Sequence, residues 1–250
     1  MRDKREKIYI YGKHAVAEAL QHAPKAVQKV FLAPQVDDQK LRSLIAKTGV
    51  PTGSLKEGAF QEVSRDASHQ GVIGHVALEH LVRPYTEFID SLEATPRTSL
   101  VLLDELQDPH NVGAIIRSAA AFGLSGVLIP EHNQAPITGA VVKVSAGMAF
   151  RIPLVAIGNV NMTVRDLKDR GFWIYGLAGE GTMPLPQEKF ERATVFVVGN
   201  EGAGVRLKTK ELCDVLISIP NHPRCESLNA AAAAATTFYA WSVRHPDALR

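Results

Sequence analysis

The segment SLVLLDELQDPHNVGAIIRSAAAFG, residues 99–123, predicts how this chain folds. Its start, residues 99–106, is an apolar run typical of a buried strand. The polar loop DPHN follows, and the Ala- and Ile-rich residues 112–122 predict a helix. A strand, a loop and a helix in this order form the repeating unit of α/β proteins with parallel sheets.

The same alternation continues to the end of the chain. We therefore expect residues 99–250 to form an α/β domain around a mostly parallel sheet. Further strands are predicted at residues 126–130, 151–157, 172–178, 194–200 and 215–220, and further helices at residues 139–146, 162–169, 209–213 and 228–243.

Residues 1–79 have a different pattern, which predicts a smaller mixed α/β domain. Residues 80–98 contain Pro84 and Pro96 and are predicted to be a linker. The elements expected in the smaller domain are a strand, glycine turn and helix in IYIYGKHAVAEAL (8–20), a strand in AVQKVFLAP (26–34), a helix in DDQKLRSLIAKTG (37–49) that ends at Gly49, a short helix in GAFQEVS (58–64) and a strand in HQGVIGHVAL (69–78).

The composition is that of a soluble globular protein. Hydrophobic residues make up 46% of the chain and charged residues 22%. The net charge is +2 and there is no polybasic tail, so the overall charge neither demands nor excludes a nucleic-acid partner. The two cysteines lack CxxC spacing, which argues against a zinc site or a disulfide framework. The charged start lacks the apolar core of a signal peptide, and no apolar stretch has transmembrane length. We expect a cytoplasmic protein without metal or membrane attachment.

The loops that follow the predicted strands are the places to look for a site, because ligands of α/β sheets bind beyond the carboxyl ends of the strands. Asn111 lies at an N-cap-like position after the first strand, and a simple capping role is the alternative to a functional one. Arg117 stands in an otherwise apolar helix, where it is either functional or an ordinary surface residue. His110, in a loop beside a proline, has the pattern of a solvated side chain.

A second segment, VFVVGNEGAGVR at residues 195–206, leads from a buried strand into a glycine-rich loop. Glycine lets a backbone approach a ligand closely, although many such loops are plain turns. The spacing is GxxGxG, so the dinucleotide fingerprint GxGxxG is absent, which argues against a nicotinamide dehydrogenase. Glu201, placed between glycines, indicates a functional carboxylate or a partner for an arginine. The weaker GLAGEG at residues 176–181 has the same spacing.

The third segment, SIPNHPRCESLNAAAAAATTFYAW at residues 218–241, ends a strand, crosses a polar loop and enters an alanine-rich helix. Ser227 is a good N-cap for a helix that begins at Leu228, and a structural role is the alternative for both Ser227 and Asn229. Cys225 and His222 are a weak candidate for a nucleophile and its base, and Cys213 is expected to be buried.

Taken together and in this order, the three segments resemble the SpoU/TrmH branch of the SPOUT methyltransferases. The matching pieces are residues 111–117, residues 199–204, and Ile219-Pro220 followed by Ser227-Leu228-Asn229. YGKHAVAEAL and HQGVIGHV resemble the substrate-recruiting N-terminal domain of the RlmB-type ribosomal RNA enzymes, so the resemblance covers nearly the whole chain. It implies a homodimer of α/β subunits with a trefoil-knotted cofactor site, a topology that periodicity cannot reveal.

The resemblance further implies methyl transfer from S-adenosylmethionine to a ribose 2′-hydroxyl of RNA, with a guanosine of 23S ribosomal RNA as the expected target. Arg117 would take the hydroxyl proton or clamp an RNA phosphate, and Glu201 would hold Arg117 in place. The positions that match the family's catalytic residues are Asn111, Arg117, Glu201, Ser227 and Asn229, and those whose backbone holds the cofactor are Gly199, Ile219 and Leu228, with Leu177 to Gly179 alongside.

Two alternatives stay open at this point. One is a 2′-O-methyltransferase for a different ribosomal RNA nucleotide or for tRNA, and the other is a catalytically silent RNA-binding assembly factor on the same fold. The chain also departs from the family pattern after Pro220, because Asn221 and Pro223 stand where Met and Gly are usual. This leaves the shape of the loop from Asn221 to Glu226 open.

Overall fold

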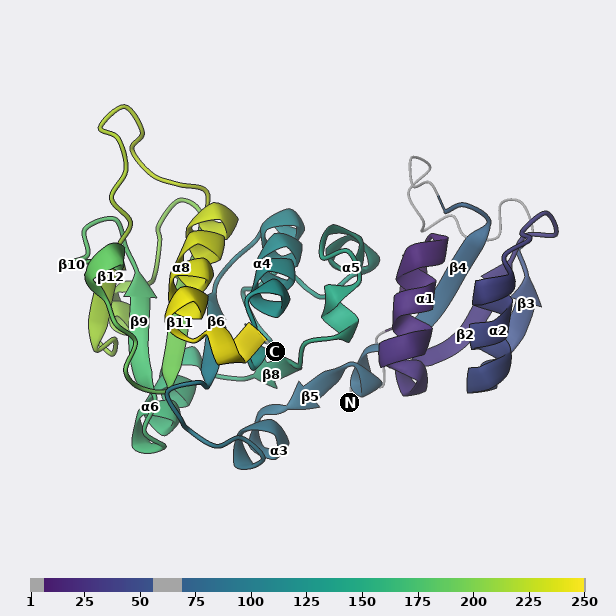
Figure 1. The fold of residues 1–250 in the computed structure, drawn as a ribbon, viewed down its shortest axis with the longest axis horizontal. Helices are drawn as coiled ribbons and strands as arrows, with labels where there is room; N and C mark the ends of the chain where they lie inside the picture. The colour runs from purple at the N-terminus through teal and green to yellow at the C-terminus, as the bar shows by residue number, and fades with distance from the viewer. Residues whose placement is uncertain (1–6, 56–68, 250) are drawn as a thin grey trace. The chain divides into compact units, whose positions relative to one another are not determined.

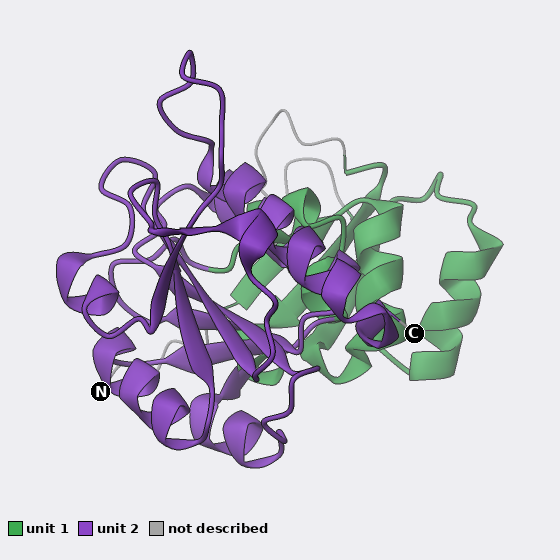
Figure 2. Cartoon of the chain, turned by 60° about the vertical axis from the view of Figure 1, so that its left-hand side comes forward, with its two compact units in different colours: residues 1–82, 137–151 green, residues 83–136, 152–250 purple. Residues whose placement is uncertain are grey.

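The computed structural model describes residues 7–55 and 69–249, which form two compact units (Figures 1 and 2). The first unit is residues 1–82 with residues 137–151, and the second is residues 83–136 with residues 152–250. The predicted division into 1–79, 80–98 and 99–250 stays a prediction. The helix predicted at residues 58–64 lies outside the described residues.

A four-stranded mixed sheet forms the centre of the first unit. Its central strand β4 pairs antiparallel with β1 and β2, and β3 pairs parallel with β2. The strands in spatial order are β1 (Lys7–Tyr11), β4 (Val72–Ala77), β2 (Val27–Leu32) and β3 (Thr52–Ser54), and the helices of the unit are α1 (Lys13–His22), α2 (Gln39–Thr48) and α5 (Gly139–Val144), with single 3₁₀ turns at η1 (Pro24–Ala26), η2 (Leu78–His80) and η3 (Met148–Phe150).

Local sequence explains where α2 begins and ends. The Asp38 side chain accepts a hydrogen bond from the Leu41 amide at 3.1 Å and so caps the first turn. Gly49 follows the last turn with φ of 68°, in the left-handed region that glycine enters without strain. The prediction that this helix ends at Gly49 is therefore confirmed.

A buried carboxylate links α1 to the segment 137–151 within the first unit. The Glu18 side chain is 10% exposed and lies under a two-pronged contact from Arg151, with Nε–Oε2 at 2.7 Å and Nη2–Oε1 at 3.0 Å. The hydrogen bond from Arg151 lowers the pKa of the Glu18 carboxyl, against the opposing effect of burial. The pair therefore contributes to stability as long as Glu18 is ionised.

We predict that Arg151→Met lowers the free energy of unfolding by about 1–2 kcal/mol at pH 7, because it leaves Glu18 buried without its partner. The expected loss of unfolding free energy is smaller than for a fully buried ion pair, because the Arg151 side chain is 43% exposed. Glu18 has a lowered pKa in the folded state, so its contribution is complete above about pH 4.3 and disappears as the pH falls through the folded value. Urea denaturation of both proteins at pH 7 and pH 3 should show the difference shrinking at pH 3. An equal difference at both pH values would contradict this account.

An eight-stranded sheet forms the centre of the second unit. Every pairing from β10 across to β8 is parallel. The order across the sheet is β10 (Met183–Pro184), β12 (Val215–Ser218), β9 (Trp173–Leu177), β11 (Thr194–Gly199), β6 (Ser99–Asp104), β7 (Gly126–Pro130), β8 (Leu154–Ile157) and β5 (Val82–Pro84). The α/β class and the parallel sheet are therefore confirmed, whereas the trefoil knot stays a prediction.

Helices cover both faces of this sheet. Alternate side chains of a strand point to opposite faces, and apolar side chains on both faces of these strands need to be buried. Val195 and Val197 of β11 belong to the core that α3 and α6 cover. Phe196, between them, faces the other way and packs ring to ring on Phe238 of α8, with 5.5 Å between centroids. Figure 1 shows α4 and α8 side by side. The helices of the unit are α3 (Tyr85–Asp90), α4 (Pro109–Ala121), α6 (Val160–Asp169), α7 (Leu207–Lys210) and α8 (Ala230–Arg244), with 3₁₀ turns at η4 (Leu185–Gln187) and η5 (Pro246–Leu249).

The alanine run in α8 serves packing, as expected. Ala231 and Ala234 are buried, at 9% and 0% exposed. Both lie on the side of α8 that faces the protein, and α8 packs against α4 and β11. Small side chains on this side let the two helix backbones approach closely.

Some element boundaries differ from the sequence prediction for local reasons. The strand predicted at residues 99–106 ends at Asp104, because Glu105 has φ of 63° and turns the chain out of the sheet. The strand predicted at residues 151–157 begins only at Leu154, after a turn. The short elements β3, β5, β10 and α3 were not predicted, and two of them, β5 and α3, occupy the expected linker.

Candidate active site

Parallel pairing brings four loops to one edge of the larger sheet. β6, β11, β9 and β12 are consecutive neighbours, and in the register of the central pair Gly199 lies opposite Asp104. The segments that leave these strands therefore emerge side by side. They are residues 105–108, 200–206, 178–182 and 219–229.

Asn111 was predicted at an N-cap-like position, but it lies inside the first turn of α4, three residues after the N-cap. The cap is Asp108, whose carboxylate accepts a hydrogen bond from the His110 amide at 2.8 Å, and Pro109 opens the helix. The expectation of a cap at Asn111 is therefore wrong, because Asp108 satisfies the free amide earlier. This leaves the Asn111 side chain, which is buried, free to make other contacts.

Asn229 caps α8, a position that the sequence assigned to Ser227. Its Oδ1 accepts hydrogen bonds from the amides of Ala231 at 2.9 Å and Ala232 at 3.3 Å, so the helix begins at Ala230. The expected cap at Ser227 and the start at Leu228 are thus wrong. Because Oδ1 is occupied by the helix, the Asn229 amide nitrogen points elsewhere as a donor.

The two asparagines and Glu201 form a directional chain of hydrogen bonds. Nδ2 of Asn229 donates to Oδ1 of Asn111 at 2.9 Å, and Nδ2 of Asn111 donates to Oε1 of Glu201 at 2.8 Å. The cap sets the direction of this chain. Oδ1 of Asn229 accepts from the helix amides, so Nδ2 of Asn229 donates to Oδ1 of Asn111, and Nδ2 of Asn111 is left to donate to Glu201. Three residues from three distant segments are thereby aligned at one point.

The glycine-rich loop that carries Glu201 is a tight turn closed on itself. The backbones of Asn200 and Gly204 exchange two hydrogen bonds, at 3.0 and 2.9 Å, and the Asn200 side chain accepts from the amides of Gly202 and Ala203. A side chain at Gly199 would come within 2.2 Å of the Gly204 backbone, so only glycine fits there. Glu201 is exposed at the tip of this turn.

A pocket of about 370 Å³ opens between these loops, a volume in the range of small-molecule sites. The predicted cofactor residues Gly199, Ile219 and Leu228 all line it, as do Glu201 and Ser227. The wall is formed mainly by the glycine-rich loop, by the segment from Leu177 to Glu180, by the ends of β11 and β12, and by the start of α8. Asn111 and Asn229 do not line the pocket and reach its rim through Glu201.

The pocket wall combines bare backbone, aliphatic side chains and carboxylates. At Gly179 and Gly204 no atom lies within 4 Å of the place a Cβ would take, so the backbone there is open to a ligand. Lys210 on the wall is already paired with Glu180 and lowers the pKa of that carboxyl through a hydrogen bond. Glu201 and Glu226 remain, which suits a small ligand with positive charge.

Arg117 is placed apart from the other four predicted catalytic residues. Its side chain is exposed on α4, does not line the pocket, and makes no hydrogen bond or ion pair with any residue in 7–55 or 69–249. Six residues along a helix correspond to a rotation of about 240°, so Asn111 and Arg117 leave α4 in different directions. The expected contact from Glu201 to Arg117 is therefore absent, and Glu201 holds Asn111 instead.

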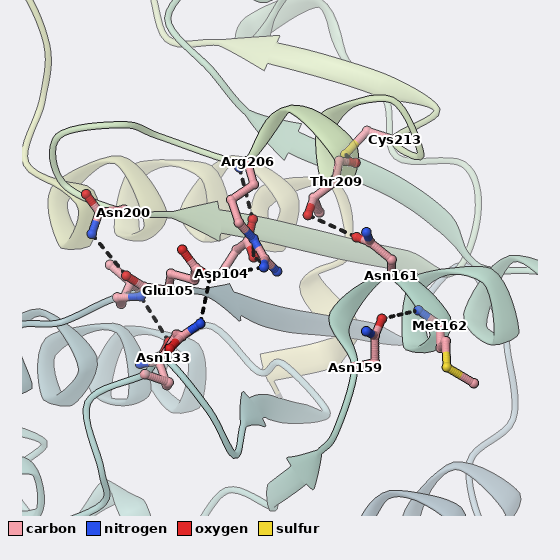
Figure 3. Close-up of polar contacts among 12 residues, drawn as sticks. Asp104, Glu105, Asn133, Asn159, Asn161, Met162, Asn200, Arg206, Thr209 and Cys213 are labelled. Carbon is pink, nitrogen blue, oxygen red and sulfur yellow. Dashed lines mark hydrogen bonds and ion pairs between the residues drawn. The ribbon is translucent and has the colours of Figure 1, made fainter.

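A cluster of charged residues that was not predicted lies behind the glycine-rich loop and is drawn in Figure 3. Arg206 contacts both Asp104 and Glu105, at the point where β6 ends. The available signal was the pair of acidic residues at the end of a strand that is otherwise apolar, together with an arginine that follows the loop. A charge in that position requires a partner.

The remaining candidates do not form a catalytic group. Burial raises the pKa of the Cys213 thiol to about 12, and its Sγ donates to the Thr209 carbonyl at 3.3 Å. Cys225 is exposed, and His222 Nδ1 accepts a hydrogen bond from the Arg224 amide in a local turn.

Within residues 7–55 and 69–249, no three His, Cys, Asp or Glu side chains lie close enough together to bind a metal ion. No helix in this part of the chain combines the length and the apolar character needed to cross a membrane.

We predict different effects for two substitutions of Asn229. Asn229→Ala removes the cap of α8 and should lower the free energy of unfolding by about 1 kcal/mol. Asn229→Asp keeps an oxygen for the Ala231 and Ala232 amides, so it should lose less stability than Asn229→Ala. It also replaces the donor to Asn111 by a second carboxylate, so the chain to Glu201 is broken. Urea denaturation at pH 7 measures both effects; equal destabilisation by the two variants would contradict the capping role.

Comparison with known protein families covers both units. Residues 98–239 match the SpoU rRNA methylase family, and residues 9–81 match a family described as RNA 2′-O ribose methyltransferase substrate binding. The first match contains all of the segments that form the pocket and the asparagine–glutamate chain.

Individual relatives agree with this match. The chain is 36% identical over 228 residues to the 23S rRNA (guanosine-2′-O-)-methyltransferase RlmB of Pseudomonas syringae pv. tomato, which is 90% of this chain and 90% of that protein. It is 37% identical over 229 residues to the RlmB of Escherichia coli, 90% of this chain and 93% of that protein.

Among solved structures, the SpoU methyltransferase AviRb of Streptomyces viridochromogenes, in complex with AdoMet, superposes with a TM-score of 0.83. It is 22% identical in sequence, and the match covers 99% of this chain and 95% of that one. At this identity the comparison establishes a shared fold.

Proposed function

Because this chain belongs to the SpoU rRNA methylase family, we propose that it is an S-adenosylmethionine-dependent RNA methyltransferase that modifies the ribose 2′-hydroxyl of a guanosine in 23S ribosomal RNA. The target is inferred from the RlmB relatives and from the substrate-binding domain that precedes the methylase domain. With this substrate the enzyme acts in the cytoplasm.

The observation that carries the proposal is the chain from Asn229 through Asn111 to Glu201 at the rim of the glycine-lined pocket. A methyl transfer to a hydroxyl needs the acceptor oxygen to be held in line with the bond that breaks, so positioning supplies much of the acceleration. A chain of fully paired side chains that ends at the pocket wall is suited to that purpose.

The residues of the pocket fit the proposed cofactor. Gly199, Ile219 and Leu228 would hold it through backbone and aliphatic contacts, and the open backbone at Gly179 provides room. When bound, S-adenosylmethionine supplies an electrophilic methyl group on a positively charged sulfur. The carboxylates on the wall suit that charge.

The RNA side of the site uses the exposed polar groups near the rim. Ser227 lines the pocket from the loop before α8 and would orient the ribose hydroxyl. A guanidinium stays protonated in proteins, so we assign to Arg117 the binding of an RNA phosphate. Its exposed position on α4, outside the pocket, supports contact with a large polyanion.

We further propose a homodimer built on the outer face of α4 and α8. Tyr239 and Val243, four residues apart on α8, are 58% and 56% exposed and form an apolar surface. Arg117 and Ala121 are exposed on the neighbouring helix α4. A symmetric contact across this face would carry Arg117 of the partner subunit toward the pocket from which this subunit's own Arg117 is turned away.

The proposed reaction predicts a specific product. The protein, incubated with methyl-labelled S-adenosylmethionine and a 23S ribosomal RNA transcript, should label one guanosine ribose, which mapping of 2′-O-methyl positions would locate. The Glu201→Gln variant is the control, because it weakens the acceptor of the Asn111 hydrogen bond and should label much less. Label in tRNA instead would contradict the target. A folded protein that does not bind S-adenosylmethionine would favour a silent RNA-binding factor.

The placement of Arg117 predicts a separable loss. Arg117→Ala should abolish turnover and leave the affinity for S-adenosylmethionine within about twofold, since Arg117 is not part of the pocket wall. Mixing Arg117→Ala with Glu201→Gln subunits under exchange should restore about a quarter of wild-type activity, because half of the dimers then hold one intact site. No recovery on mixing, with mixed dimers confirmed by mass, would contradict the role of the partner subunit.

A further inference from the structure

The last residue of β6 carries a buried carboxylate that is held by one arginine. Asp104 is 0% exposed, and its Oδ1 accepts a hydrogen bond from Nε of Arg206 at 2.8 Å and forms an ion pair with Nη2 at 2.6 Å. Its Oδ2 accepts from the backbone amide of Arg206 at 3.1 Å. Burial alone would lower the pKa of the Arg206 guanidinium, but the contacts with Asp104 and Glu105 outweigh it and raise that pKa. Both carboxylate oxygens of Asp104 are therefore engaged by Arg206.

The next residue, Glu105, contacts the same arginine and has a backbone conformation that is rare for a glutamate. Glu105 has φ of 63°, a left-handed conformation that is strained for a residue with a side chain. Its carboxylate accepts from Nη1 of Arg206 at 3.0 Å and from the Asn133 amide at 3.4 Å. Its backbone carbonyl accepts from Nδ2 of Asn200 at 3.0 Å. Figure 3 shows these contacts converging on the end of β6.

These contacts anchor the glycine-rich loop at both ends. Asn200 stands at its start and Arg206 at its end, and both are fastened to residues 104 and 105. Between them, Glu201, Gly202 and Ala203 are exposed, and only Val205 is buried. A loop with so little core of its own takes its position from its anchors.

We propose that Arg206, held by Asp104 and Glu105, is a positioning residue that places the glycine-rich loop and thereby keeps Glu201 within hydrogen-bond reach of Asn111. It touches neither the pocket nor the reacting groups, and it acts through the loop that forms the pocket wall. A lysine could supply the charge but not the three-pronged geometry that Asp104 and Glu105 receive. The inference rests on the proposed function, since the loop is the expected cofactor wall.

A second arginine that bridges two carboxylates offers a control for this role. The Arg170 side chain is 38% exposed and bridges Asp90 and Asp166, and the Arg206 side chain is 40% exposed and bridges Asp104 and Glu105. Arg170 is the C-cap of α6 and does not line the pocket. Arg206→Met and Arg170→Met each remove an arginine that bridges two carboxylates, and only the first removes an anchor of the loop. The carboxylates differ in burial, since the Asp104 side chain is 0% exposed and those of Asp90 and Asp166 are 65% and 42% exposed.

Two measurements on these variants test the proposal: the Kd for S-adenosylmethionine by calorimetry, and the ¹⁵N chemical shift of the Asn111 side-chain amide. We expect Arg206→Met to raise the Kd about tenfold, because charge-assisted hydrogen bonds that order the loop are lost. It should also move the Asn111 signal, as its bond to Glu201 is loosened. Arg170→Met should change neither, although it also removes an arginine that bridges two carboxylates. Arg206→Lys should fall between Arg206→Met and the wild type.

An unchanged Kd and an unchanged Asn111 signal in folded Arg206→Met would overturn the proposal, as would equal changes in Arg170→Met. If Arg206→Met does not fold, Glu105→Gln decides: it keeps Asp104 intact, and we expect about a threefold rise in Kd with a shifted Asn111 signal. If the wild type itself fails to bind S-adenosylmethionine, the proposed function fails. The Asn111 signal then still tests the positioning role, because it reports the loop without the cofactor.

Discussion

The parallel pairing of β6, β11, β9 and β12 is the constraint on which the site depends. Parallel neighbours end at the same edge, so each loop that leaves them is delivered to one place. β11 comes late in the chain but lies between β6 and β9, and this puts the glycine-rich loop between the start of α4 and the remaining pocket wall. The insertion of one strand thus joins segments about a hundred residues apart.

At that edge, one residue joins helix stability to the arrangement of the site. Asn229 uses its oxygen to begin α8 and its nitrogen to hold Asn111, and Asn111 in turn holds Glu201. The buried member of the chain, Asn111, is satisfied on both sides, as a buried amide must be. Glu201 and Ser227, which face the pocket, are exposed and available to a ligand. Exposed polar groups that are held in place by buried, fully hydrogen-bonded side chains are the arrangement expected of a functional site.

The sequence analysis predicted most of this edge because short motifs retain their order. The strands of the larger sheet, the glycine-rich loop, and the pocket-lining Gly199, Ile219 and Leu228 follow from local patterns and from the resemblance to the family. Errors arose where one polar side chain replaced another as a helix cap. Asp108 rather than Asn111 caps α4, and Asn229 rather than Ser227 caps α8. Several residues in each segment can cap, and only the geometry of the turn selects one.

By itself the sequence determined the alternation of strands and helices, the class of fold, the ordered motifs and the family, because these depend on local periodicity and on residues close together in the chain. Only the tertiary structure decided which of those residues meet. Asn111 contacts Glu201 while Arg117 is directed away from both, since the helix rotates by about 100° per residue and the strand order fixes which face of α4 meets the loop. It also revealed the Asp104–Arg206 pair, because two charges that lie far apart in the chain become partners only when β11 takes its place beside β6.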